Sequence, residues 1–240
     1  MLLKTTYKVT SKLETLYTGG PVVTAARSST SPQASRVIAC AREQDVALVS
    51  LSTGRVALLL PGDGTDLTSI VLHPHLTRLV SCHASHQLRE WNLSSFSSSS
   101  TTSQEEGSDT SSNNVPAPEK TWKIAQAFVS SSAYDETGTL IAFGCTDARI
   151  RVWEDEKGYY THTLRASGAG VITNVVWAPR TTAAASSSLV LATTGSIDNS
   201  VRIWRLAAKE MIVKELKGHS SAVSAIAFSH NDDGDDTVLV

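Results

Sequence analysis

The chain has 240 residues, 41% of them hydrophobic, and a formal net charge of −2. These values exclude a wholly disordered chain, because the apolar residues suffice to form a sizeable core. The near-neutral charge argues against broad electrostatic binding to nucleic acid, although a local basic patch is compatible with it. The N-terminal residues contain no long apolar run, so neither a signal peptide nor a transmembrane helix is predicted.

Two short strands are expected before the first repeated unit, at residues 4–10 and 12–18. The second of them is either a plain N-terminal arm or an outer strand that closes a ring with the last unit of a circular fold. A first unit without a tryptophan follows, with strands predicted at 22–26, 36–41, 45–50 and 55–60.

A second unit ends its third strand with Trp91, and Ser85 occupies the turn before that strand. Its predicted strands are 67–72, 78–83 and 87–91. The segment 94–118 is dominated by Ser and Thr and cannot bury enough apolar surface to offset its ordering entropy, so a disordered loop is predicted. This loop is either a neutral insertion or a phosphorylation target and partner tether.

The third and fourth units carry two copies of one motif, at residues 147–153 and 198–204. In each copy a turn with an Asp precedes a short strand that alternates apolar and polar residues and ends in Trp. The other strands predicted for these units are 128–134, 139–146 and 159–164, and then 171–177, 188–196 and 210–216.

A fifth unit opens at Gly218-His219, with strands predicted at 223–228 and 237–240. Four strands per unit at a period of roughly 40–45 residues is typical of a β-propeller blade. The predicted fold is therefore all-β, with about four blades and the start of a fifth in one incomplete propeller over residues 1–240. Because such a set does not close a ring, the chain is expected to be the N-terminal fragment of a longer one.

The turn carboxylates of Asp147 and Asp198 are expected to accept hydrogen bonds from nearby backbone N–H groups and thereby fix the turns. Their role is predicted to be structural rather than catalytic. The tryptophans that end the third strands are expected to pack between neighbouring blades, and they are Trp91, Trp153 and Trp204.

Three arginines share strands with these tryptophans, namely Arg149, Arg151 and Arg202. Their stems are expected to line the blade face while their charged heads reach solvent. Three cysteines, Cys40, Cys82 and Cys145, lie on or just after predicted second strands. An odd number without a pairing pattern predicts reduced core thiols and an intracellular protein.

Catalytic and metal-binding patterns are weak in this sequence. Four histidines cluster at His73, His75, His83 and His86, but no Cys or carboxylate is spaced to complete a ligand set, so no metal site is predicted. The acidic run 232–236 lacks the spacing of a calcium loop. Without a nucleophile motif, a phosphate-binding glycine loop or paired catalytic carboxylates, the sequence predicts no enzyme, no cofactor and no small-molecule substrate.

The two Asp-to-Trp motifs and the Gly218-His219 pair resemble those of WD40-repeat proteins. The segments 16–20, 121–123 and 158–165 further resemble the N-terminal propeller of the transducin-beta-like-three family. This resemblance implies a buried network in which the turn Asp, a His from the loop before the blade, a Ser or Thr and the Trp are linked. His219 alone stands in a Gly-His pair, its Asp partner would lie beyond residue 240, and Gln126 replaces the usual His of blade three.

The family resemblance also implies a function. Its members are nucleolar proteins with tandem propellers and a C-terminal helical domain, within the UTP-B subcomplex of the small-subunit processome. The resemblance thus implies a non-catalytic scaffold that supports pre-ribosomal RNA processing. Its expected protein partners are other WD40 and helical subunits of the processome. U3 small nucleolar RNA and pre-ribosomal RNA are expected to associate with it through the complex. The alternatives are an adaptor, such as a ubiquitin-ligase substrate receptor or a signalling beta-subunit, and an enzyme with a site in the central channel.

Overall fold

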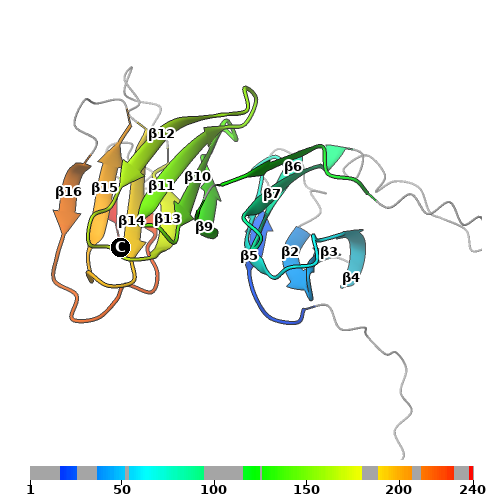
Figure 1. The fold of residues 1–240 in the computed structure, drawn as a ribbon, viewed down its shortest axis with the longest axis horizontal. Helices are drawn as coiled ribbons and strands as arrows, with labels where there is room; N and C mark the ends of the chain where they lie inside the picture. Colours follow the sequence, from blue (N-terminus) through cyan, green and yellow to red (C-terminus); the bar gives the residue numbers. More distant parts are fainter. Residues whose placement is uncertain are drawn as a thin grey trace, which may run out of the picture.

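A computed structural model describes most of the chain as consecutive β-strands (Figure 1). The described residues are 17–25, 37–51, 54–94, 116–124, 126–179, 189–206, 212–229 and 238–239. Within them the strands form four four-stranded antiparallel sheets and one two-stranded ladder. In each sheet every strand pairs with the next one in the sequence. The all-β, blade-by-blade architecture predicted from the sequence is confirmed.

The first two blades contain all the strands predicted for the first two units, with bounds that differ by at most a few residues, and blade two has in addition a fourth strand for which no bounds were predicted. Blade one contains β1 Val22–Ala25, β2 Val37–Arg42, β3 Asp45–Ser50 and β4 Arg55–Leu60. Blade two contains β5 Leu67–Leu72, β6 Arg78–His83, β7 Gln87–Asn92 and β8 Lys120–Lys123.

The next two blades contain the repeated motif. Blade three contains β9 Val129–Tyr134, β10 Leu140–Cys145, β11 Arg149–Glu154 and β12 Tyr159–Arg165. Blade four contains β13 Ile172–Trp177, β14 Val190–Gly195, β15 Val201–Arg205 and β16 Ile212–Leu216.

Alternating side chains explain why the motif folds as a strand. Along β11, Ile150 and Val152 are fully buried, whereas Arg149 is exposed and Arg151 is half-buried. Successive side chains of a strand point to opposite faces, so one face of blade three is apolar and the other carries the arginines. The turn before this strand contains Ala148 with a φ of 58°, and the matching turn of blade four contains Asn199 with a φ of 50°. These left-handed residues close the tight hairpins that precede β11 and β15.

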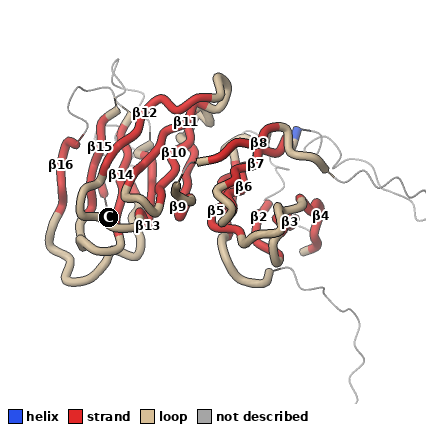
Figure 2. Tube along the Cα trace, in the orientation of Figure 1, coloured by secondary structure: helices blue, strands red, loops and turns tan. Residues whose placement is uncertain are grey.

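The blades follow one another in chain order across the molecule (Figure 2). Neighbouring first strands are joined by side-chain hydrogen bonds: the Ser69 and Ser132 hydroxyls lie 2.6 Å apart, and the Ser130 hydroxyl donates to the Ile172 carbonyl at 2.6 Å. The three largest apolar clusters fill the spaces between the four blades, and each of the three contains the tryptophan of a third strand. Trp91 lies in the cluster of blades one and two, Trp153 in that of blades two and three, and Trp204 in that of blades three and four.

The fifth unit differs from the prediction. Residues 223–227 are not in a strand, and only β17 Phe228–Ser229 pairs with β18 Val238–Leu239. The predicted strand 223–228 is therefore wrong for most of its length. The carbonyls of Val223 and Ser224 are taken by the Asn174 side-chain amide, at 3.4 and 3.2 Å, instead of by a strand ladder.

Several predictions lie wholly or mostly outside the described residues. They are the N-terminal strands 4–10 and 12–18, the loop 94–118 and the acidic run 232–236. The three cysteines are described, all are buried, and none of them forms a disulfide bond. None of the helices in the described part of the chain is long and apolar enough to span a membrane.

Candidate functional site

The turn carboxylates of blades three and four are held by arginines of the following strand. The Arg151 guanidinium donates two hydrogen bonds to Asp147, at 3.0 and 2.7 Å. Asp198 forms the equivalent ion pair with Arg202. Burial opposes ionisation of Asp147, but the Arg151 contacts outweigh this effect and lower the pKa of the carboxyl. The partners that fix these turns are therefore mainly arginine side chains, whereas the sequence predicted backbone N–H groups.

The charged heads of two arginines do not reach solvent, which corrects the sequence prediction. Arg202 is buried, and it also donates to the Ser167 carbonyl at 3.1 Å and pairs with Glu215 at 3.2 Å. Arg151 is largely enclosed by its pairing with Asp147. Arg149 alone follows the prediction, with 48% of its side chain exposed. Each of these two guanidinium groups forms an ion pair with the turn carboxylate four residues earlier in the sequence, and this pairing keeps it against the blade.

A buried polar network lies in blade two, where the sequence motif is weakest. The Trp91 indole donates to the Ser81 hydroxyl at 3.1 Å, and this hydroxyl lies 3.0 Å from His83 Nε2. His83 Nδ1 lies 3.1 Å from the Asp63 carboxylate. Asp63 comes from the loop before the blade, and His83 ends the second strand. The carboxylate thus comes from the loop in which the WD40 resemblance implied a His, whereas the imidazole comes from the end of the second strand and Ser85 holds the position of the turn Asp.

Electrostatics keep this network in one protonation state. Burial lowers the pKa of His83, and Asp63 offsets only part of that effect, so the imidazole is neutral at neutral pH. Burial also opposes ionisation of Asp63, but hydrogen bonds from Ser85 and Thr65 outweigh it and lower the pKa of Asp63. The Arg89 guanidinium donates to the Gly62 carbonyl at 2.9 Å and holds the loop that presents the carboxylate.

The order Ser81, His83, Asp63 has the connectivity of a hydrolase triad, but its environment is that of a core. Ser81 and His83 are each only 1% exposed, and the Ser81 hydroxyl already accepts the Trp91 N–H. A nucleophile has to be reached by a substrate carbonyl, which this position does not allow. The network therefore serves to fix the blade.

Sequence reasoning missed Asp63 and Ser81, although a signal for Ser81 was present. Ser81 lies 10 residues before Trp91, and Thr193 lies 11 residues before Trp204 and accepts its indole N–H at 2.8 Å. A hydroxyl residue at this spacing identifies the acceptor. Blade three has no equivalent, because the fully buried Phe143 occupies the corresponding region of β10.

Trp153 of blade three is held by aromatic packing. Its ring stacks on Trp122 with centroids 4.8 Å apart and planes at 8°, and Tyr160 meets it edge-on at 4.8 Å. Offset stacking and edge-to-face contacts of this kind stabilise aromatic clusters. Gln126, at the position of the missing His, is exposed and has a φ of 64°.

The clustered histidines do not form a common site. His73 and His75 pack against each other with ring centroids 5.5 Å apart, His83 belongs to the blade-two network, and His86 lies against Phe128. Within the described ranges, no group of three His, Cys, Asp or Glu side chains could hold a metal ion. His219 is exposed on the loop that follows blade four.

Blades two and three are joined by an ionic cluster whose two carboxylates are buried. Arg78 donates to Asp155 at 2.9 Å and lies 3.5 Å from Glu90, and Lys120 lies 3.3 Å from Glu90. The Tyr134 hydroxyl lies 3.3 Å from Asp155. Two cations balance two carboxylates, so the cluster is neutral as a whole and connects the outer part of one blade to the next.

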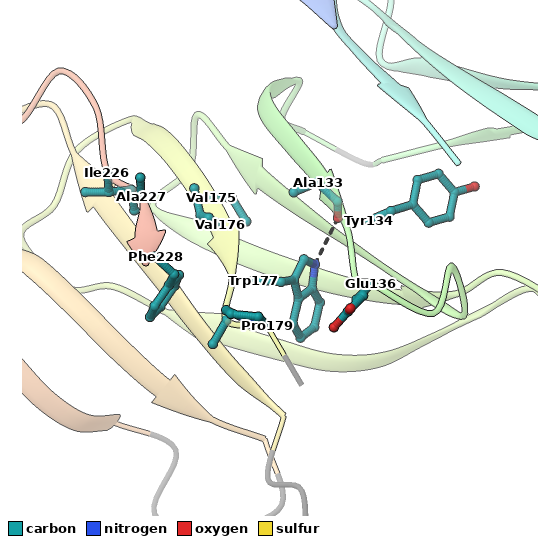
Figure 3. A pocket seen from close by; sticks show the side chains of 11 residues that line it. Ala133, Tyr134, Glu136, Val175, Val176, Trp177, Pro179, Ile226, Ala227 and Phe228 are labelled. Atoms are coloured by element: carbon teal, nitrogen blue, oxygen red, sulfur yellow. Dashed lines mark hydrogen bonds between the residues drawn. The ribbon is translucent and has the colours of Figure 1, made fainter. Parts of the chain in front are cut away.

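A largely apolar pocket of about 540 Å³ lies beside blades three and four (Figure 3). Its wall includes Trp177 and Pro179 at the end of β13, and Ile226 and Phe228 from the fifth unit. The Trp177 indole is fixed by a hydrogen bond of 3.0 Å to the Ala133 carbonyl. The lining offers mainly apolar contact area, and its ionisable residues are Tyr134 and Glu136.

Comparison with known families agrees with the repeat and its geometry. The family described as WD domain, G-beta repeat matches residues 118–154, 158–205 and 211–234. The chain contains WD40 repeats. In these WD40 blades the Asp, Trp and hydroxyl positions serve to fix hairpins and to join neighbouring sheets.

The WD40 chain is also similar to curated proteins over most of its length. Transducin beta-like protein 3 of Mus musculus is 29% identical over 228 residues, covering 94% of this chain and 24% of that protein. The protein of the same name from Homo sapiens is 30% identical over 178 residues, covering 73% of this chain and 19% of that protein. The chain thus spans about a quarter or less of the length of these relatives. The resemblance inferred from the short sequence segments is confirmed.

Proposed function

We propose that this WD40 chain is a non-catalytic scaffold subunit of the small-subunit processome, where it supports pre-ribosomal RNA processing and formation of the 40S subunit. The observation that carries the proposal is the similarity to transducin beta-like protein 3 over 94% of the chain. The motif segments 16–20, 121–123 and 158–165 point to the same family. The proposed location is the nucleolus.

The geometry of the site supports a scaffold rather than an enzyme. The one Ser-His-Asp arrangement among the described residues is enclosed and holds a tryptophan. The surface instead offers loops and blade edges, which are suited to contacts with protein partners. U3 small nucleolar RNA and pre-ribosomal RNA are proposed to associate with the chain through the assembled particle.

The test is affinity purification of the tagged full-length protein, followed by sequencing of the RNA and identification of the proteins that copurify. Enrichment of U3 and pre-ribosomal RNA over a tag-only control is the expected result. Recovery of ubiquitin-ligase or signalling subunits without those RNAs would overturn the proposal and assign the chain to a propeller adaptor. Microscopy of the same tagged protein tests the nucleolar location independently.

A further inference from the structure

Two exposed arginines face each other at one edge of blade three. Arg149 begins β11 and Arg165 ends β12, and the two are direct partners in the antiparallel register. Directly opposite residues of an antiparallel pair project from the same face with Cβ atoms about 5 Å apart, and like charges in this arrangement destabilise the sheet. The repulsion between Arg149 and Arg165 lowers the stability of the sheet, so the stability of the fold does not explain why both positions are arginine.

Neighbouring acidic groups do not neutralise this pair. Arg149 lies 3.9 Å from Asp147, whose carboxylate already forms two shorter bonds with Arg151. Among the described residues the Arg165 guanidinium has no ion-pair partner, and the loop 166–171 that follows it contains no acidic residue. Arg149 and Arg151 therefore share the single carboxylate of Asp147, and the charge of Arg165 is not paired among the described residues, which leaves uncompensated positive charge on this edge.

An exposed aromatic ring lies at the inner end of the same edge. Phe128 is 39% exposed, and its carbonyl accepts the Thr146 N–H at 3.1 Å, so it adjoins the turn that carries Asp147. His86 of blade two packs against the ring, with centroids 6.0 Å apart. From Phe128 to Arg165 the edge runs across all four strands of blade three, with an apolar contact at one end and two cations at the other.

We propose that this edge, formed by Phe128, Arg149 and Arg165, is a docking site for an acidic protein segment that carries an apolar side chain. Carboxylates of the segment neutralise the arginine pair, and its apolar residue covers Phe128. Arginine and aromatic residues are the side chains that most often anchor protein interfaces. The whole chain has a net charge of −2, whereas nucleic acid requires an extended basic surface.

This docking edge rests on the proposed scaffold function and deepens it by naming the chemistry of one partner. Its test uses the purified full chain and a short fluorescent peptide with a central Leu-Phe pair flanked by glutamates. Fluorescence anisotropy measures the dissociation constant for the wild type and for the double variant Arg149→Glu, Arg165→Glu. We expect at least a tenfold weaker binding for the double variant, equivalent to about 1.4 kcal/mol or more.

A matched control lies at the other end of the same hairpin. Lys157 is exposed in the turn between β11 and β12, so Lys157→Glu reverses one charge on this blade away from the proposed edge. Binding by this variant should be within about twofold of the wild type, since the screening length at physiological salt is about 8 Å. Phe128→Ser should weaken binding without altering its dependence on salt concentration.

Two results would overturn the proposal. One is equal affinity of the wild type and the double arginine variant for the peptide. The other is tight binding of a labelled single-stranded RNA that depends on both arginines, without binding of the peptide. Thermal denaturation shows that the variant is folded, and Arg165→Glu should even raise the melting temperature because it removes the like-charge pair. A failed peptide assay leaves the particle purification as a separate test of the scaffold function.

Discussion

The three motif tryptophans differ in whether their indole N–H group has a hydrogen-bond acceptor. Trp91 and Trp204 donate to a hydroxyl on the second strand of their own blade, whereas Trp153 has no hydrogen-bond acceptor and stacks on Trp122. A buried N–H without a partner costs free energy, which the stacked ring offsets through its contact area. The same sequence position is therefore held by polar chemistry in two blades and by aromatic packing in the third.

Replacing the hydroxyl in blade two tests this account. Ser81→Ala removes the acceptor of the Trp91 N–H and the partner of His83, and we expect it to lower the free energy of unfolding by about 1–3 kcal/mol. Urea denaturation followed by tryptophan fluorescence measures the change. Thr163→Ala, on an exposed position of β12, is the baseline variant. Equal midpoints for the two variants would show that the network contributes nothing to stability.

Histidine burial makes stability depend on pH. The pKa of His83 is lower in the folded chain than in the unfolded chain, so the unfolded state binds an extra proton as the pH falls below about 6.5. Stability should consequently decrease between neutral pH and about pH 5.5. The carboxylate of Asp63, with its lowered pKa, contributes stability that is lost only at more acidic pH.

The measurement is the urea midpoint across this pH range for the wild type and for His83→Gln. The urea midpoint of His83→Gln should change less with pH than that of the wild type, even if the variant is less stable at every pH. His73 also has a pKa lowered by burial, so His73→Gln serves as the comparison that separates the two histidines. An unchanged slope in His83→Gln would contradict the assignment.

At the scale of the strands, small residues set how closely blades three and four approach. A Cβ atom built on Gly144 of β10 would lie 2.5 Å from Ile172 Cγ2 and 2.7 Å from Val175 Cγ2. Both partners belong to β13, the first strand of the next blade, and both are buried. Glycine at this position therefore allows one sheet to pack directly on its neighbour.

The variant Gly144→Ala should destabilise the chain by about 1–3 kcal/mol, because overpacking outweighs the entropy that alanine removes from the unfolded state. Differential scanning calorimetry should record a lower melting temperature. Glu156→Ala, in the exposed turn of blade three, is the control and should have little effect. A stabilised Gly144→Ala protein would mean that the two sheets can separate at no cost.

At the scale of the whole molecule, the ionic cluster at Arg78 connects blades two and three. Arg78→Leu leaves the buried carboxylates of Asp155 and Glu90 with Lys120 as their remaining cation. Removing one partner of a buried ion pair is strongly destabilising, and we expect a loss of about 3 kcal/mol. A double-mutant cycle with Asp155→Leu measures the coupling, and strictly additive effects would show that the pair is not linked as described.

The sequence predicted the strands well because each blade uses local alternation, as in Ile150 and Val152, and both of these residues are buried. It predicted the polar contacts less well, because these depend on residues brought together by the fold. Asp63 and His83 are separated in the sequence by β5, the turn after it and most of β6, and no motif spacing joins them. The strand 223–228 failed since a strand requires a partner for its backbone groups, which alternation does not reveal.

The order of strands within each sheet has a consequence for how the chain folds. Every described strand pairs with its immediate neighbour in the sequence, so a sheet needs no contact with residues of a later blade. Contacts between residues close in sequence form at a low entropic cost and favour rapid folding. During synthesis each blade can therefore assemble as its fourth strand leaves the ribosome, and the completed blade then offers a template surface for the next.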